Sequence, residues 1–347
     1  MVIEEFGGPA AVREVPDPSP AAHGVVVRVE ATGLCRSDWH AWAGHDRSIA
    51  LPHVPGHELA GTVAEVGPEV RAWQVGDRVT VPFVCACGSC PPCLAGDHQV
   101  CDRQTQPGFT GWGSFAELVA LDHADVNLVA LPDELDAVTA AALGCRFATA
   151  FRAVVHQGRV RPGDWVAVHG CGGVGLSAVM VAVAAGARVV AVDVTAGALE
   201  LAGRFGAAEL VDASTTDAAR AVRAVTGGGA AVSLDALGSH PTAAASVRSL
   251  AKRGRHVQVG LLPPALPSSG DREPSLPMAR VIAHELEIVG SHGMAAHDYP
   301  AMLAMVAAGR LRPDLLVTRR LTLDDGADAL AAMGEPGYPA GITVLLP

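Results

Sequence analysis

Short apolar runs dominate residues 25–129 of the chain, and glycine or proline interrupts them at close intervals. Valine and other apolar residues alternate with polar ones in these runs, which is typical of β-strands with one buried face. Glycine and proline between the runs favour turns. We therefore predict a β-rich first domain, with strands in residues 25–33, 60–67, 77–83 and 115–121.

The pattern changes at about residue 148. More continuous apolar runs then alternate with alanine-rich amphipathic stretches, as in a parallel sheet that helices cover. Six such runs occupy residues 164–170, 187–193, 208–213, 231–237, 255–260 and 285–290. We predict a parallel six-stranded sheet, a loop in the Pro- and Ser-rich segment 263–277, and mixed short elements after Gly290.

The length and composition fit a globular protein of two domains. A chain of 347 residues is too long for one compact core, and 50% hydrophobic with 18% charged residues gives ample apolar surface to bury. The net charge of -11 disfavours nucleic acid and anionic membranes, which both attract clustered Lys and Arg. We therefore expect a small-molecule substrate and neither nucleic acid nor a membrane as a partner.

The N-terminus lacks the basic start and the continuous apolar core of a signal peptide. The Ala-rich apolar run 179–185 is too short to cross a bilayer. We therefore expect a cytoplasmic protein. Because the cytosol keeps thiols reduced, its eight cysteines favour metal binding or catalysis over disulfides.

A glycine-rich loop follows the first predicted strand of the second domain and consists of Gly170, Cys171, Gly172, Gly173, Val174 and Gly175. The G-x-G-x-x-G spacing allows a tight turn, close approach of the backbone to a pyrophosphate and close packing of helix on strand. The helix that follows would direct free N–H groups at the phosphates. Asp193 ends the next strand, where its carboxylate would accept hydrogen bonds from the adenine ribose and repel a 2′-phosphate. These residues predict a dinucleotide site that prefers NAD to NADP.

Four cysteines lie within fifteen positions at C-x2-C-x2-C-x7-C spacing, namely Cys87, Cys90, Cys93 and Cys101. Four thiolates can enclose one zinc ion as a tetrahedron without an open position, which is typical of a structural site. The alternatives are a redox C-x-x-C pair and chance clustering. Cys85 stands just outside the pattern, and we interpret it as a buried or spare thiol.

A second set of metal-binding side chains is spread along the first domain. Cys35 and His57 lie between β-like runs, and Cys145 comes just before the second domain. If these three residues converge, they leave one position of a zinc ion for a substrate oxygen, which is the arrangement of a catalytic site. The spacing leaves open the alternative that Cys145 is an ordinary buried thiol.

In this order along nearly the whole chain, these motifs resemble those of the zinc-containing medium-chain dehydrogenase/reductases, and within them the alcohol dehydrogenase family. The resemblance implies a two-domain α/β fold with a GroES-like β-rich catalytic domain and a six-stranded parallel Rossmann coenzyme domain. It assigns residues 1–147 to the catalytic domain with its structural-zinc lobe, 148–290 to the NAD-binding domain and 291–347 to a return to the catalytic domain. It implies an enzyme that interconverts an alcohol and an aldehyde or ketone by hydride transfer to or from NAD(H).

The resemblance also implies roles for the metal-binding residues. In the family, the residues that match Cys35, His57 and Cys145 hold the catalytic zinc, and the four-cysteine cluster holds a structural zinc, which makes two ions per chain. Glu58 resembles a carboxylate that can approach the metal. Asp38 resembles the acid that orients the ligand histidine.

Further roles concern the proton and the coenzyme. Ser37 and His40 match the hydroxyl and the histidine through which the family releases a proton, and an imidazole can exchange that proton with water near neutral pH. Arg36 resembles a residue that binds the pyrophosphate. Thr149 resembles a nicotinamide contact, and Val259 a backbone contact with the carboxamide.

Two features of the chain bear on assembly and on coenzyme binding. The short connection after Cys101 resembles the compact bacterial and yeast-like form of the family, which implies a homotetramer that pairs through an edge strand of the coenzyme domain. Near the C-terminus many members have a basic residue that assists coenzyme binding, whereas this chain has Ala340-Gly341-Ile342. One phosphate contact is therefore missing or supplied elsewhere.

Several interpretations compete with an alcohol dehydrogenase. Polyol dehydrogenases tend to use a carboxylate in place of Cys145, and quinone reductases lack the zinc ligands, so both are disfavoured. A zinc-dependent carbonyl reductase of a biosynthetic pathway has the same site and remains open. A catalytically silent NAD- or zinc-binding homologue also remains open, although it would not need Ser37 and His40.

The candidates for the substrate pocket are Trp39, Trp42, Phe83 and Trp112.

Overall fold

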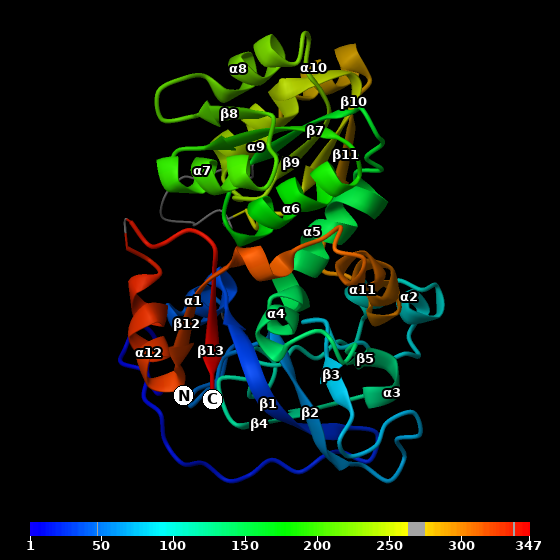
Figure 1. Ribbon diagram of the computed structural model, residues 1–347, viewed down its shortest axis with the longest axis vertical. Helices are drawn as coiled ribbons and strands as arrows, with labels where there is room; N and C mark the ends of the chain where they lie inside the picture. Colours follow the sequence, from blue (N-terminus) through cyan, green and yellow to red (C-terminus); the bar gives the residue numbers. More distant parts are fainter. Residues whose placement is uncertain (47, 263–274, 336) are drawn as a thin grey trace. The chain divides into compact units, whose positions relative to one another are not determined.

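The structure is a computed structural model that describes residues 1–46, 48–262, 275–335 and 337–347. Within these ranges the chain forms two units (Figure 1). The first unit comprises Met1–Ala148 and Gly293–Pro347, and the second comprises Thr149–His292. Most of the predicted loop 263–277 lies outside the described residues.

A seven-stranded sheet is the frame of the first unit, with the order β12-β13-β1-β2-β3-β5 and with β4 paired to β1. Its strands are β1 (Val25–Leu34), β2 (Leu59–Val66), β3 (Arg78–Thr80), β4 (Leu118–Leu121), β5 (Val129–Ala130), β12 (Val317–Thr322) and β13 (Ile342–Leu346). Neighbours are antiparallel except β12 and β13. Because β13 pairs with β1, the last part of the chain completes the sheet that the first part begins. The predicted β-rich domain is confirmed.

The valines that dominate β1 explain its position at the centre of this sheet. Val25, Val27 and Val29 are buried in one hydrophobic cluster with Leu59 and other residues of the neighbouring strands. The predicted strand 77–83 is shorter than expected, because β3 ends at Thr80. A proline follows two residues later and has no N–H to donate to a strand ladder.

Short helices connect and flank these strands. They are α1 (Arg36–Trp42), α2 (Pro91–Leu94), η1 (His98–Val100), α3 (Ala124–Asn127), α4 (Ala137–Ala141), the π-helix η2 (Leu143–Phe147), η4 (Ala296–Asp298), α11 (Tyr299–Ala307), η5 (Pro313–Leu316) and α12 (Leu323–Ala332). Helix α1 begins directly after β1, and Cys35 is its N-cap residue. A π-helix is rare and often marks a functional site. Here it contains Cys145.

The second unit is built on a six-stranded parallel sheet with the order β11-β10-β9-β6-β7-β8. Its strands are β6 (Trp165–His169), β7 (Arg188–Asp193), β8 (Glu209–Asp212), β9 (Ala230–Asp235), β10 (Leu250–Gln258) and β11 (Glu287–Gly290). The strand order reverses between β6 and β9. In open sheets of this kind, ligands bind outside the carboxyl ends of the strands at that point. The predicted parallel sheet of the Rossmann type is confirmed.

The helices of the second unit are α5 (Ala148–Arg152), which begins at the unit boundary, the π-helix η3 (Ala153–Gln157), α6 (Gly173–Ala184), α7 (Ala196–Arg204), α8 (Ala218–Val225), α9 (His240–Ser249) and α10 (Met278–His284). Helix α6 packs on β6 and β7, and α9 packs on β9. Most of α6 is buried, which explains why its sequence is apolar on nearly all sides.

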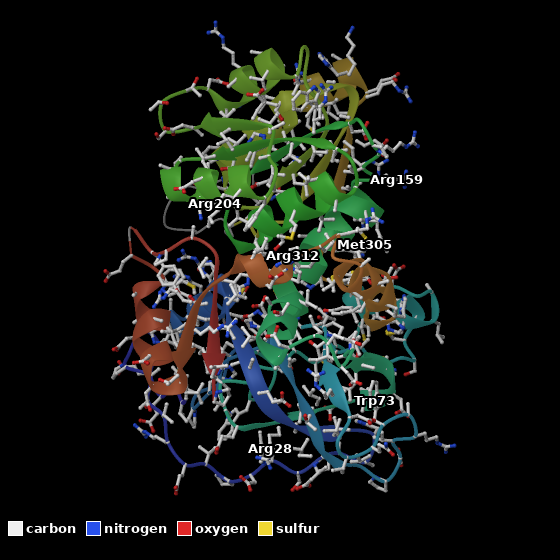
Figure 2. All side chains as sticks on the ribbon, in the orientation of Figure 1. Arg28, Trp73, Arg159, Arg204, Met305 and Arg312 are labelled. Atoms are coloured by element: carbon white, nitrogen blue, oxygen red, sulfur yellow. The ribbon has the colours of Figure 1, made fainter. Side chains whose placement is uncertain are left out.

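The outside of each unit carries the long charged side chains. Arg28, Arg159 and Arg204 are exposed (Figure 2). Among the described residues, no helix has both the length and the apolar character that a membrane span requires.

Candidate active site

Four metal-binding side chains of the first unit come together although they are far apart in sequence. Cys35 stands at the junction of β1 and α1, and Cys145 lies in η2. His57 and Glu58 directly precede β2. One ligand atom from each of the four residues lies within 4.8 Å of the others. Cys145 is partly exposed and the other three are buried, so the cluster is closed on one side and accessible on another.

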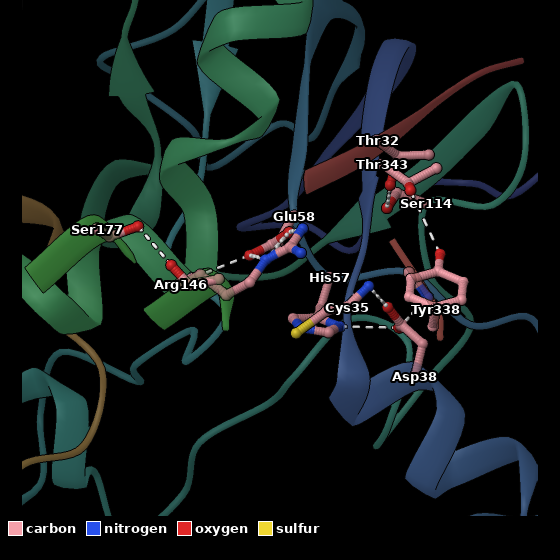
Figure 3. A network of polar contacts seen from close by, with 12 residues as sticks. Thr32, Cys35, Asp38, His57, Glu58, Ser114, Arg146, Ser177, Tyr338 and Thr343 are labelled. Atoms are coloured by element: carbon pink, nitrogen blue, oxygen red, sulfur yellow. Dashed lines mark hydrogen bonds and ion pairs between the residues drawn. The ribbon is translucent and has the colours of Figure 1, made fainter. Parts of the chain in front are cut away.

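The carboxylate of Asp38 ties these segments together (Figure 3). Its Oδ2 accepts a hydrogen bond from the backbone N–H of Cys35 at 2.8 Å. Its Oδ1 accepts a hydrogen bond from the N–H of Gly56 at 3.1 Å and lies 2.9 Å from Nδ1 of His57. Both Asp38 and His57 are fully buried. Asp38 therefore fixes the imidazole by one nitrogen and leaves the other, Nε2, to a different partner.

The surroundings of Nε2 of His57 indicate whether a metal fits the cluster. Nε2 of His57 is buried and has no hydrogen-bond partner among the described residues. An unpaired buried polar atom costs free energy, whereas an imidazole oriented by a carboxylate is a common zinc ligand. Two thiols and one imidazole also form a donor set that suits Zn2+. The residues therefore fit a zinc ion held by Cys35, His57 and Cys145.

The two thiols differ in acidity. A hydrogen bond from the thiol of Cys145, together with the charge of Arg146, lowers the pKa of Cys35 well below its ordinary value, against the effect of burial. The same hydrogen bond and burial raise the pKa of Cys145. Since thiolates are the ligands, metal binding releases the thiol protons.

Arg146 is a residue of this site that the sequence did not reveal. Its Nε lies 3.0 Å from Oε1 and 3.1 Å from Oε2 of Glu58, and its Nη2 also contacts Oε2 (Figure 3). Its backbone N–H donates to Oε1 at 2.9 Å. Burial raises the pKa of Glu58, and the charge of Arg146 opposes that effect. The available sequence signal was a single charged residue in the apolar run around Cys145.

Ser37 and His40 lie three residues apart on α1, so they share one face of the helix. Nδ1 of His40 lies 2.9 Å from Nδ1 of His45, which the sequence did not single out. Burial, and then the nearby charges of His45 and Arg36, lower the pKa of His40. His40 is therefore neutral at pH 7, which is the state that accepts a proton.

Aromatic rings flank the cluster. The ring centre of Phe83 lies 6.3 Å from that of His57, and the ring of Phe109 is nearer, at 5.1 Å. Phe109 was not among the aromatic residues expected near the substrate. Three tryptophans were also expected there. Trp39 and Trp42 pack against a hydrophobic core cluster, and Trp112 is exposed. Phe83 and Phe109 are therefore the rings beside the ligand histidine, while Trp39 lies against His40.

The four-cysteine cluster forms a second candidate metal site in the first unit and comprises Cys87, Cys90, Cys93 and Cys101. Sγ of Cys90 lies 3.3 Å from Sγ of Cys93 and 3.6 Å from Sγ of Cys101. Zinc bonds of about 2.3 Å in a tetrahedron place the sulfurs about 3.8 Å apart, whereas a disulfide requires about 2.05 Å. All four thiols are free. The geometry therefore fits an enclosed zinc ion and excludes disulfides between these sulfurs.

Hydrogen-bond donors surround these sulfurs. The backbone N–H groups of Cys87 and Arg103 each lie 3.3 Å from Sγ of Cys101. The backbone N–H of Ser89 and the guanidinium of Arg103, 3.4 Å from the sulfur, lower the pKa of Cys87 to about 5. These donors therefore stabilise the thiolate of Cys87, which is the form that binds metal.

The glycine loop of the second unit leads from β6 into α6, which begins at Gly173 and Val174 with Gly172 as its N-cap. Gly170 has a φ of +90°. A Cβ at Gly175 would lie 1.8 Å from the carbonyl oxygen of Gly170, so the helix can approach the strand only with glycine there. A Cβ at Gly172 would meet no atom within 4 Å. This open backbone at a helix N-terminus fits a pyrophosphate.

Asp193 lies at the end of β7, against this loop. Its Oδ2 accepts a hydrogen bond from the N–H of Cys171 at 2.6 Å, and its Oδ1 accepts one from the N–H of Thr195 at 2.8 Å. Each carboxylate oxygen has a second lone pair. The carboxylate is therefore held in place and retains the capacity to accept hydrogen bonds from ribose hydroxyls.

Two further residues expected to contact the coenzyme, Thr149 and Val259, lie elsewhere in the second unit, whereas Arg36 begins α1 in the first unit. Thr149 is on α5, and its Oγ1 is buried without a hydrogen-bond partner among the described residues. Val259 follows β10, and its N–H donates to the backbone oxygen of Asp235 at 3.0 Å. Asp235 itself is fully buried and was not predicted. The available signal was an acid at the end of a strand, as at Asp193.

Two protein-family descriptions match the chain. The alcohol dehydrogenase GroES-like domain matches residues 21–133, and the zinc-binding dehydrogenase domain matches residues 173–308. The first match lies within the unit that contains both cysteine clusters. The second match begins at the first residue of α6.

The alignments with similar proteins cover nearly the whole chain. The alcohol dehydrogenase of Geobacillus stearothermophilus is 35% identical over 334 residues, which are 95% of each protein. The NAD-dependent alcohol dehydrogenase of Sulfurisphaera tokodaii is 32% identical over 358 residues, covering 100% of this chain and 99% of that protein. The solved structure of the alcohol dehydrogenase from Thermus sp. ATN1 has a TM-score of 0.89 at 32% identity and covers 99% of this chain and 98% of its own. The chain therefore belongs to the zinc-containing medium-chain dehydrogenase/reductase family, among its alcohol dehydrogenases.

Proposed function

We propose that this protein is an NAD-dependent zinc alcohol dehydrogenase, which interconverts an alcohol and an aldehyde or ketone by hydride transfer to or from NAD(H). The observation that carries the proposal is the convergence of Cys35, His57 and Cys145 around an unpaired imidazole nitrogen. Family membership supports zinc and NAD as the cofactors.

Zinc at this site supplies a Lewis acid for the substrate oxygen, and NAD supplies the hydride acceptor. In the proposal, Cys35, His57 and Cys145 hold the ion and leave one position for substrate. Because the carboxylate of Asp38 binds Nδ1 of His57, the other ring nitrogen, Nε2, is directed away from Asp38. Glu58 lies close enough to approach the metal, but Arg146 engages both of its oxygens.

The departing proton is assigned to two residues of α1. Oγ of Ser37 passes the proton from the substrate hydroxyl towards His40. With the tautomer in which Nδ1–H of His40 donates to Nδ1 of His45, Nε2 of His40 is the nitrogen that accepts the proton and exchanges it with water. The lowered pKa of His40 keeps this acceptor neutral at pH 7.

The coenzyme is assigned to the second unit, with a contribution from Arg36 to the pyrophosphate. The glycine loop residues that would bind the pyrophosphate are Gly170, Gly172, Gly173, Val174 and Gly175. Asp193 would accept the ribose hydroxyls and select NAD over NADP. Thr149 and Val259 would contact the nicotinamide.

We assign a second, structural zinc to the cluster of Cys87, Cys90, Cys93 and Cys101, so the chain would hold two ions. We also propose a cytoplasmic homotetramer whose partners are small alcohols and carbonyl compounds. An edge strand, β11, supports pairing of subunits through the coenzyme domain, because an unpaired edge can extend a sheet. Eight free thiols agree with a reducing compartment.

The proposal is tested by elemental analysis of the purified protein together with NADH formation on a panel of primary and secondary alcohols. We expect about two zinc ions per chain, and we expect Cys145→Ala to lose one of them together with turnover. Cys85→Ala, a buried cysteine outside both clusters, should retain both. Active wild type with no zinc would overturn the proposal. Faster reduction of aldehydes than oxidation of any alcohol would identify the same site as a carbonyl reductase.

A further inference from the structure

Asp235 is a fully buried acid at the end of β9. Its Oδ1 accepts hydrogen bonds from the backbone N–H groups of Leu237 and Gly238, both at 3.0 Å. Its Oδ2 accepts a hydrogen bond from Nε2 of Gln258 at 2.9 Å. A buried carboxylate is costly unless it is well hydrogen-bonded, and this one collects donors from two separate strands and their turns.

The turn after β10 is bound to the same residue. The backbone oxygen of Asp235 accepts hydrogen bonds from the N–H of Val259 at 3.0 Å and of Gly260 at 2.8 Å. Nε2 of Gln258 also donates to the backbone oxygen of Gly260 at 2.7 Å. A Cβ at Gly260 would lie 2.2 Å from the backbone N of Gly238, so the two turns touch. Asp235 therefore sets the turns 237–238 and 259–260 against each other.

A buried histidine fixes the orientation of Gln258. Nε2 of His256 lies 3.1 Å from Oε1 of Gln258, and its Nδ1 lies 3.0 Å from Oγ of Ser246. With its oxygen towards His256, the amide directs its NH2 group to Asp235. The chain of hydrogen bonds thus runs from the sheet interior to the two turns.

The strand order places these turns relative to the glycine loop. β9 and β10 lie on one side of β6, and β7 with Asp193 lies on the other. A dinucleotide on such a sheet lies across the carboxyl ends, with one mononucleotide on each side of the point where the order reverses. Since Asp193 belongs to the adenine side, the turns after β9 and β10 belong to the nicotinamide side. Leu237 also approaches the glycine loop, because a Cβ at Gly170 would lie 3.0 Å from its Cβ.

We propose that Asp235, coupled to Gln258, is the positioning residue for the nicotinamide half of the coenzyme. The inference rests on the proposed NAD-dependent function and adds a residue that acts through backbone groups. Its carboxylate holds the turns 237–238 and 259–260 in one arrangement before coenzyme arrives. The adenine half depends on Asp193, which lies on the other side of β6.

The test compares the dissociation constants of NADH and of 5′-AMP, which lacks the nicotinamide half. Asp235→Asn preserves shape but replaces one acceptor oxygen with an NH2 group, so at least one donor loses its partner. We expect the Kd of NADH, measured by fluorescence titration, to rise about tenfold. We expect the Kd of 5′-AMP, measured by calorimetry, to stay within about twofold. A defect that merely loosened the whole unit would weaken both ligands alike.

Two further variants complete the design. Gln258→Met removes the amide that joins Asp235, Gly260 and His256, and we expect it to weaken NADH binding about threefold and to leave 5′-AMP binding unchanged. Asp212→Asn is the matched control, because Asp212 also ends a strand and accepts from a turn N–H, that of Ser214 at 2.8 Å, but in an exposed turn. It should change neither constant.

The inference is overturned if Asp235→Asn leaves both constants unchanged or raises both by the same factor. If Asp235→Asn does not fold, an unchanged NADH constant for Gln258→Met overturns it. A wild-type protein that binds no NADH would instead overturn the proposed function itself.

Discussion

The guanidinium of Arg146 holds both carboxylate oxygens of Glu58 beside the thiol of Cys145, with its Nε at 3.0 and 3.1 Å from them. The pair packs against bare backbone of β1, because a Cβ at Gly33 would lie 2.2 Å from Oε2 of Glu58. Both members are buried. Removal of one member alone would leave a buried charge without its partner, which is far more costly than removal of both.

Arg146→Met should therefore destabilise the protein by about 3–5 kcal/mol, because Glu58 stays buried without its counter-charge. The double variant Arg146→Met with Glu58→Gln should recover most of this loss. The measurement is the free energy of unfolding in urea, with the zinc content determined for each variant. Equal stability of the single and the double variant would show that the pair's charge does not govern this site.

Asp38→Asn should weaken zinc binding at the Cys35–His57–Cys145 cluster by about 10–100-fold. Asparagine cannot supply two carboxylate oxygens to the N–H groups of Cys35 and Gly56 and to His57 at once. Competition with a chelator, followed by metal analysis, measures the effect. Asp136→Asn is the control, since Asp136 caps α4 through the N–H and the hydroxyl of Thr139 and belongs to neither cluster. Loss of zinc from both variants alike would contradict the assigned role of Asp38.

Cys93→Ser should remove one zinc ion per chain and lower the unfolding midpoint of the first unit. The three thiolates that remain are too few to enclose the ion. NADH binding by the second unit should persist. Cys85→Ala provides the comparison, since burial raises the pKa of the Cys85 thiol to about 12 and the residue belongs to neither cluster. Retention of both ions by Cys93→Ser would remove the structural site from the assignment.

Because of His169, the free energy of unfolding should decrease as the pH falls below neutral. This histidine ends β6 in the interior, where burial and the nearby His256 lower its pKa to about 3, while the unfolded chain titrates near 6.5. The unfolded state therefore binds a proton first as the pH falls. The resulting loss of stability begins below about pH 6.5, continues to about pH 3 and amounts to about 4–5 kcal/mol at most.

Unfolding in urea at a series of pH values between 7 and 4 measures this dependence. His169→Gln should flatten it, because glutamine does not titrate. An identical slope for His169→Gln and the wild type would mean that other groups cause the acid sensitivity.

Local sequence patterns were sufficient for the two sheets, because the alternation of apolar residues reflects which face of a strand is buried. They failed at strand ends, as at β3, where loss of a single N–H at proline shortens the ladder. The resemblance placed residues 291–347 with the first domain, but no local pattern predicted that β13 pairs with β1, since pairing of distant segments depends on long-range packing.

The sequence by itself determined the glycine loop and the four-cysteine cluster, because their chemistry is contained in a few consecutive residues. Only the tertiary structure decided that Cys35, His57 and Cys145 meet, that Arg146 engages Glu58, and that Asp235 joins two turns. These relationships join distant segments through buried side chains. Their geometry is set by the packing of strands and helices, which no local spacing records.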